Sequence, residues 1–185
     1  MAEYYLISQL PSLDGIGETT PMPITEERFL ELCGRFLGQK AQRKIERLTL
    51  LPPLDHEKSG SPLIDAWNIG ERALRIALAK ARADKMNKPF DSEDQPPSVE
   101  LTRVASSAVE IKNPLEAEIF LLNYRLGFLE ALRPMDNFSE DFVFYYGIKL
   151  KLLSRIRQFD TKLGEGEYKK IYNSILSGDN LEALL

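Results

Sequence analysis

The sequence predicts an all-α fold, an antiparallel helical bundle with long central helices. Three observations lead to this prediction. Apolar residues recur at steps of three and four over residues 142–163, which is the period of one helix face. Thr25, Asn113 and Ser139, residue types that favour helix starts, each precede an apolar periodic stretch. No segment shows the sustained alternation of apolar and polar residues that forms a half-buried sheet.

The N-terminal segment leaves its structure open. Residues 4–10 form a short apolar run that fits either a short strand or a buried helical turn. Residues 12–23 are rich in glycine, proline and small polar residues, so we expect a loop. Thr25 is expected to cap the next helix, because two glutamates follow it and suit the positive end of a helix. Gly38 is expected to end this helix. The apolar face of this helix consists of Phe29, Leu30, Cys33, Phe36 and Leu37.

The middle of the chain predicts two more helices and a linker. Residues 39–50 fit a short helix, and residues 63–87 fit a longer one with a broad, alanine-rich apolar face. Residues 88–98 hold three prolines and three acids and form the clearest linker. We therefore expect an N-terminal helical unit at 1–90, an acidic proline-rich linker at 91–100 and a C-terminal helical unit at 101–185, which can also pack as one domain.

The C-terminal unit predicts four helices. A modest one covers 101–111, and a second begins at Asn113, because proline and an acid follow this cap, and runs to about residue 132. Ser139 starts the last long helix, which is expected to reach residue 163. Gly164 and Gly166 predict a turn before a final helix at 167–176. The apolar face of the helix expected at 139–163 consists of Phe142, Tyr145, Ile148, Leu152, Ile156, Phe159 and Leu163.

Composition bounds the class of protein. The chain has 185 residues, 43% hydrophobic residues, one cysteine and one histidine, so a disulfide within the chain and a Cys/His zinc site are excluded. No apolar run approaches the roughly 18 residues of a membrane span, and no signal peptide is visible, so we expect a cytoplasmic protein. A net charge of −4 argues against a nucleic-acid partner. The aromatic residues are expected to pack in the core.

The residues capable of chemistry favour structural roles. His56 and Asp55 are neighbours in a polar loop, and we interpret His56 as a surface residue; an enzyme would need the two gathered in a pocket. Glu116, Glu118 and Glu130 lack the inward Glu-x-x-His pairs of a di-iron bundle. We expect no catalytic residue, no metal and no cofactor, and we expect a core role for the cysteine.

Two charged patterns are notable. Glu71 and Arg75 lie four residues apart on one helix, which predicts either a surface ion pair or a polar contact between helices. The last long helix carries a basic side opposite its apolar face, consisting of Lys149, Lys151, Arg155 and Arg157.

Several stretches resemble a known bacterial family of uncharacterised proteins that is associated with vacuolar-type (V-type) ATPases. These stretches are YYLISQLPSL, NPLEAEIFLLNYRLGFLEAL and FYYGIKLKLLSRIRQFD, and together they reach from Tyr4 to about Asp160. More distantly, ERALRIALAKARADK resembles the Glu-x-x-Leu-Arg helices of the C-type subunit of archaeal-type ATPases, the counterpart of the eukaryotic d-type subunit. Proteins of this C-type family usually hold three helical repeats, whereas two comparable units are visible here.

The resemblance implies a non-catalytic coupling component that joins the central rotor shaft to the membrane rotor ring of a V/A-type ATPase. Its partners would be the central stalk and the rotor ring, which would place it peripherally at the inner membrane. The residues expected to contact these partners are Arg72, Arg75, Lys149, Lys151, Arg155 and Arg157. The alternative is a free-standing helical adaptor that binds another soluble protein.

Overall fold

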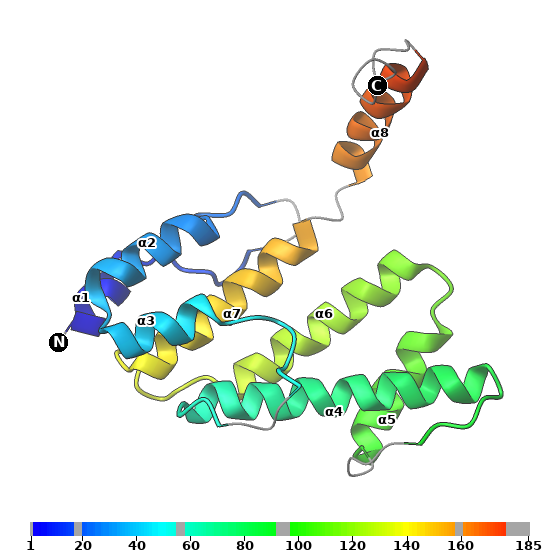
Figure 1. Cartoon of the computed structure of the whole chain (residues 1–185), viewed down its shortest axis with the longest axis horizontal. Helices are drawn as coiled ribbons and strands as arrows, with labels where there is room; N and C mark the ends of the chain where they lie inside the picture. The colour runs from blue at the N-terminus through cyan, green and yellow to red at the C-terminus, as the bar shows by residue number, and fades with distance from the viewer. Residues whose placement is uncertain (1, 17–19, 55–57, 92–96, 158–160, 177–185) are drawn as a thin grey trace, which may run out of the picture.

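The computed structural model describes residues 2–16, 20–54, 58–91, 97–157 and 161–176, and within these ranges it contains eight α-helices and no strand. The all-α prediction is therefore confirmed. The helices, shown in Figure 1, are α1 (Ala2–Gln9), α2 (Glu26–Phe36), α3 (Gln39–Glu46), α4 (Pro62–Lys85), α5 (Val99–Glu110), α6 (Pro114–Ala131), α7 (Glu140–Arg157) and α8 (Thr161–Leu176).

The N-terminal run forms helix α1, so the option of a short strand is wrong. A strand must find its hydrogen-bond partners on a neighbouring strand, and the described part of the chain offers none. A helix satisfies its backbone internally, and α1 buries Leu6 completely while Tyr4 and Tyr5 remain exposed.

The expected helix starts are confirmed by their capping bonds. The Thr25 hydroxyl accepts a hydrogen bond from the Arg28 amide at 3.2 Å. The Asn113 side chain accepts from the Leu115 amide at 3.0 Å, with proline at the first helical position. The Ser139 hydroxyl accepts from the Phe142 amide at 3.2 Å, immediately before α7. Each cap satisfies a backbone donor that the first turn leaves free.

The end of the chain differs from the expectation. From the sequence, the helix that starts after Ser139 is expected to reach residue 163. Instead, α7 ends at Arg157 and a separate helix, α8, begins at Thr161. The turn expected at Gly164 and Gly166 is also wrong, since both glycines lie inside α8. Glycine lowers helix propensity by about 1 kcal/mol relative to alanine but does not forbid a helix. Phe159, which belongs to the expected apolar face of this helix, lies outside the described residues.

Helix α7 lies at the centre of the fold. It contacts α1, α2, α3, α4 and α6, and ten of its residues are buried. Its apolar side chains belong to a large core that also takes in α1 to α3, Trp67 of α4 and Leu122 and Leu129 of α6. Both halves of the sequence therefore contribute to one core.

A second, smaller core lies between the C-terminal half of α4, helix α5 and the N-terminal half of α6. Its buried members are Leu74, Ala77, Leu78, Ala105, Ala108 and Leu121. Small side chains on α4 and α5 allow these two helices to pack closely.

No described helix combines the length and the apolar character that crossing a bilayer would need. Of the expected linker, residues 88–91, 97 and 98 are described and form no helix, whereas residues 99 and 100 already belong to α5.

Candidate partner-binding groove

A groove lined by arginines opens between α4, α6 and α7. Its volume is about 500 Å³. Each helix contributes residues from one face: α4 at steps of three and four, α6 at steps of three, one and three, and α7 at a step of three. The lining residues are Leu50, Leu51, Arg75, Leu78, Arg82, Glu118, Leu121, Leu122, Arg125, Leu152 and Arg155. Leucines thus supply an apolar floor, and four arginines supply the charge.

The groove exists because α4 and α6 meet closely at one end only. At Gly70 the ring of Phe128 lies directly against the α4 backbone, and a β-carbon at this glycine would overlap the ring. The Phe128 ring also packs beside Trp67, with centroids 6.0 Å apart. From this crossing the two helices diverge toward the C-terminus of α4 (Figure 1), and the groove fills the widening space.

A buried ion triad lies beneath the groove. The Glu71 side chain is 1% exposed, and Arg125 of α6 donates to both of its carboxylate oxygens, at 2.8 and 2.9 Å. Arg75 Nε donates to Glu71 Oε1 at 2.9 Å from the same helix. A buried carboxylate needs such partners, because its desolvation is otherwise very costly. Both interpretations hold in part: Glu71 and Arg75 form an ion pair within α4, and Glu71 makes the polar contact between helices through Arg125.

The triad joins the two cores. Trp67, one turn before Glu71, belongs to the large core, and Leu74, one turn after it, belongs to the small core. On α6, Arg125 likewise lies between Leu129 of the large core and Leu121 of the small core. The ion pair between Glu71 and Arg125 therefore sets the relative position of α4 and α6 where the groove begins.

The remaining charges leave the groove net positive. Arg155 binds Glu118 with two nitrogens, each 2.9 Å from Glu118 Oε1. Arg82 is exposed at the edge of the groove. Four arginines face two glutamates, Glu71 and Glu118, which leaves two positive charges. Arg75 and Arg155 stay roughly half exposed, at 43% and 47%, so a ligand can reach them.

The structure brings together two of the six residues that the sequence singled out, Arg75 and Arg155. Arg72 donates instead to the Pro53 carbonyl at 2.5 Å. Lys151 pairs with Glu26 at 2.7 Å, on the side of α7 that faces α2. Arg157 is half-buried at the end of α7.

Lys149 departs most from the expected basic face, because it is buried, with a relative exposure of 8%. Its Nζ lies 2.6 Å from Asp14 and 2.6 Å from Glu130, and 3.2 Å from the Tyr145 hydroxyl. Burial alone would lower the pKa of Lys149, but these hydrogen bonds outweigh burial and raise it. The expected single basic face on α7 is therefore wrong, since Lys149, Lys151 and Arg155 pair with acids on different sides of the helix.

Sequence reasoning missed Arg82 and Arg125. Arg125 left a readable signal, because it is the only charge in the apolar stretch LLNYRLGFL at the centre of a helix. Such a charge must face solvent or a buried partner of opposite sign. Arg82 left no comparable signal among the many basic residues of α4.

The other candidates take structural roles where they are described. Cys33 is fully buried, and burial raises the pKa of its thiol to about 12, which confirms the core interpretation. The three glutamates considered as metal ligands bond to different partners: Glu116 to Asn113, Glu118 to Arg155 and Glu130 to Lys149. The part of the chain that the structure describes holds no group of three metal-ligating side chains. His56 and Asp55 lie outside the described residues.

Comparison of the chain with protein-family models, with curated proteins and with solved structures finds no match.

Proposed function

We propose that this chain is a non-catalytic component of a rotary V/A-type ATPase, similar to its C-type subunit, that couples the central rotor shaft to the membrane rotor ring. In this proposal the arginine groove receives an acidic segment of a neighbouring ATPase protein. The observation that carries the proposal is the convergence of Arg75, Arg82, Arg125 and Arg155, from three helices, on one apolar-floored groove.

The chemistry of the groove favours a carboxylate-bearing protein segment. Guanidinium groups bind carboxylates through two parallel hydrogen bonds, which fixes orientation as well as adding affinity. The leucines between the arginines suit the apolar side chains of the same segment, because a binding surface combines an apolar centre with a polar rim. An amphipathic acidic helix presents both features on one face.

The internal pairs hold the arginines in place before a partner arrives. Arg125 is fixed by Glu71, and Arg155 by Glu118. Ordering long side chains in advance reduces the conformational entropy that binding would otherwise lose. A partner carboxylate can share Arg155 with Glu118 without breaking the frame.

The identity of the partner rests on the family resemblance of the sequence. A component that transmits torque between a shaft and a ring needs a rigid frame and charged contact surfaces. The central position of α7 and the buried charges that connect distant helices are consistent with such a frame.

A free-standing helical adaptor is the second candidate, and the same groove supports it. The two candidates differ only in the protein that the groove binds. The position of the gene beside genes for ATPase subunits would favour the first.

The proposal is tested by affinity purification of the tagged chain from its native cells at moderate salt. The groove variant carries Arg82→Glu and Arg155→Glu. The matched control carries Lys40→Glu and Lys80→Glu, which reverse two exposed charges that do not line the groove. Circular dichroism checks that both variants keep their helical content.

Recovery of shaft or rotor-ring subunits with the native chain and the control, but not with the groove variant, supports the proposal. Equal recovery with both variants contradicts the role of the groove. Recovery of unrelated soluble proteins, with no part of the ATPase among them, contradicts the coupling role and leaves the adaptor.

A further inference from the structure

We propose that a second groove, between α3 and the start of α4, binds a phosphate ester that carries two or more negative charges. The groove has a volume of about 430 Å³, within the range of small-molecule sites. Among the residues that the structure describes, four cations and no acidic side chain line it. The lining residues are Arg43, Lys44, Arg47, Leu48, Thr49, Leu51, Pro53, Lys58, Ser59, Ile64 and Asn68.

Helix α3 is built to present cations along this groove. Ala41 and Ile45 bury one side of the helix in the large core, so Arg43 and Arg47 fall on the opposite, exposed side. These two arginines lie one turn apart, where like charges repel each other. Among the described residues neither of them forms an ion pair. An anion between them would relieve the repulsion.

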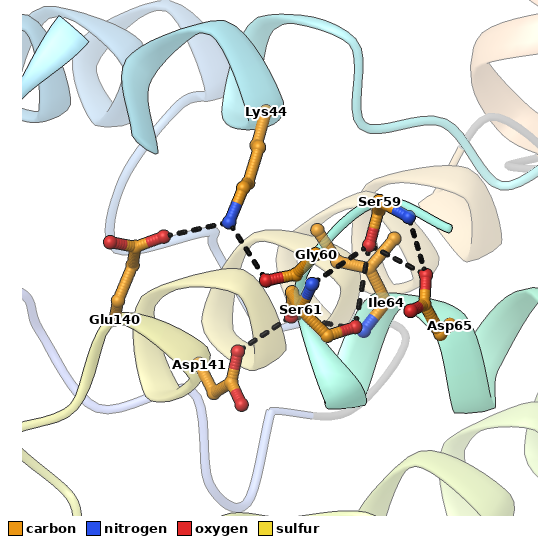
Figure 2. Close-up of polar contacts among 8 residues, drawn as sticks. All are labelled: Lys44, Ser59, Gly60, Ser61, Ile64, Asp65, Glu140 and Asp141. Atoms are coloured by element: carbon orange, nitrogen blue, oxygen red, sulfur yellow. Dashed lines mark hydrogen bonds and ion pairs between the residues drawn. The ribbon is translucent and has the colours of Figure 1, made fainter. Parts of the chain in front are cut away.

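Another of the four cations, Lys44, is held in place by residues at the starts of α4 and α7. Figure 2 shows its Nζ between the Gly60 carbonyl and Glu140, at 3.2 Å from each oxygen. Lys44 therefore ties α3 to the start of both α4 and α7. Its charge is partly compensated by Glu140, which leaves Arg43, Arg47 and Lys58 as the cations available to a ligand.

Two described carboxylates near the groove, Asp65 and Asp141, accept hydrogen bonds from serines of the 58–61 segment. Asp65 accepts hydrogen bonds from the Ser59 amide at 2.8 Å and from the Ser59 hydroxyl at 2.7 Å (Figure 2). Asp141 accepts from the Ser61 hydroxyl at 2.5 Å, and this hydroxyl also caps α4 by accepting from the Ile64 amide at 3.3 Å. These bonds hold the 58–61 segment rigid, and neither aspartate is among the residues that line the groove.

Phosphate chemistry fits the groove better than a single carboxylate does. A carboxylate carries one charge and would leave two of the three available cations uncompensated. A phosphate monoester or a diphosphate carries about two charges or more near neutral pH, and arginine forks bind its oxygens in pairs. Leu48, Leu51 and Ile64 provide an apolar wall for the organic part of the ester.

This site is independent of the proposed function. It shares only Leu51 with the arginine groove. Its cations come from α3, the residue after α3 and residue 58, whereas those of the arginine groove come from α4, α6 and α7. The phosphate could belong to a soluble ester or to a lipid headgroup, and the experiment separates these sources.

The test is isothermal titration calorimetry of the full chain with sodium pyrophosphate and with ADP. It is combined with sedimentation of the chain with phosphatidylcholine vesicles, with and without phosphatidic acid, a lipid whose headgroup is a phosphate monoester. The site variant carries Arg43→Gln and Arg47→Gln. The matched control carries Lys40→Gln and Lys80→Gln, which remove the same charge from exposed positions outside the groove.

We expect saturable binding of pyrophosphate or ADP that the site variant weakens at least about tenfold and the control leaves within about twofold. Co-sedimentation with phosphatidic acid vesicles that the site variant alone loses assigns the phosphate to a lipid headgroup and also supports the site. Absence of both forms of binding overturns the proposal. Equal weakening in both variants overturns it as well. A polyglutamate peptide is titrated in the same way, and its binding without binding of pyrophosphate or ADP also overturns the proposal.

Discussion

Two buried charges, Glu71 and Lys149, connect helices that are distant in the sequence. Among the described residues, these two are the charged residues that are buried. Glu71 joins α4 to Arg125 of α6, and Lys149 joins α7 to Glu130 at the end of α6 and to Asp14 in the loop after α1. Removing one partner of such a contact leaves a charge in a poorly solvated place.

Replacing Arg125 with alanine is therefore expected to lower the free energy of unfolding by about 3 kcal/mol. Arg75→Ala removes the more exposed partner of the same carboxylate, and its expected cost is about 1 kcal/mol or less. Urea denaturation followed by circular dichroism measures both. Similar, small losses in the two variants would contradict a buried triad.

The Lys149 cluster predicts a dependence of stability on pH. Hydrogen bonding and charge interaction with Lys149 lower the pKa of Asp14. Burial acts to raise the pKa of Glu130, but hydrogen bonds from Lys149 and Tyr145 outweigh it, so this pKa is lowered too. The unfolded chain then binds more protons than the folded chain around pH 4, so stability rises with pH in this window.

We expect Lys149→Met to cost most above about pH 5 and progressively less as the pH falls through the lowered carboxyl pKa values. Urea midpoints of the native chain and the variant between about pH 3 and pH 7 measure this difference. Lys151→Met, which removes a more exposed pair with Glu26, is the matched control. A Lys149 effect that is constant over this range would refute the coupling.

At the scale of single residues, the sequence predicted chemistry better than location. It identified Arg75, Arg155 and Glu71 as notable because their charges stand out on amphipathic helices. It placed Lys149 on a basic face because lysine is usually solvated, whereas the loop that carries Asp14 covers it in the fold. Such a contact joins residues 135 positions apart and has no local signal.

Helices α4 and α6 depend on one close approach. Gly70 lets the Phe128 ring lie against the α4 backbone, and this crossing determines where the arginine groove begins. Gly127, one residue before Phe128, faces open space instead. Gly127 therefore serves as a control for Gly70, because it lies beside Phe128 in the sequence but outside the contact.

We expect Gly70→Ala to destabilise the fold by about 1 to 3 kcal/mol, because the aromatic ring must move out of its packed position. Gly127→Ala should stabilise it by about 0.5 to 1 kcal/mol, because alanine is the better helix former and meets no neighbour. Thermal and urea unfolding measure both variants. Stabilisation by both would show that the crossing at Gly70 is loose.

The helix starts could be predicted, and one helix end could not. Caps at Thr25, Asn113 and Ser139 are local hydrogen-bond signals, so the sequence alone identifies them. The end of α7 at Arg157 carries no such signal, since the apolar spacing of the sequence continues beyond it and the glycines that suggested a turn lie inside α8.

At the scale of the whole molecule, the groove results from how the helices pack. The sequence predicts amphipathic helices but not which of them diverge, and the divergence of α4 from α6 depends on Phe128, Gly70 and the Glu71 triad together. This explains why Arg75 and Arg155 could be singled out from the sequence while the groove itself could not.

The central claim is that the arginine groove holds an acidic segment of an ATPase protein in the cell. A photo-crosslinking amino acid in place of Leu51, which is 60% exposed and lines the groove, tests this claim most directly. The same replacement at Lys80, outside the groove, is the control.

We expect illumination of native cells to crosslink position 51, and not position 80, to an acid-rich peptide of the rotor shaft or the rotor ring. Combining the replacement with Arg82→Glu and Arg155→Glu should abolish this product. Crosslinks from position 51 that contain no ATPase protein, or that survive the charge reversal, would contradict the central claim.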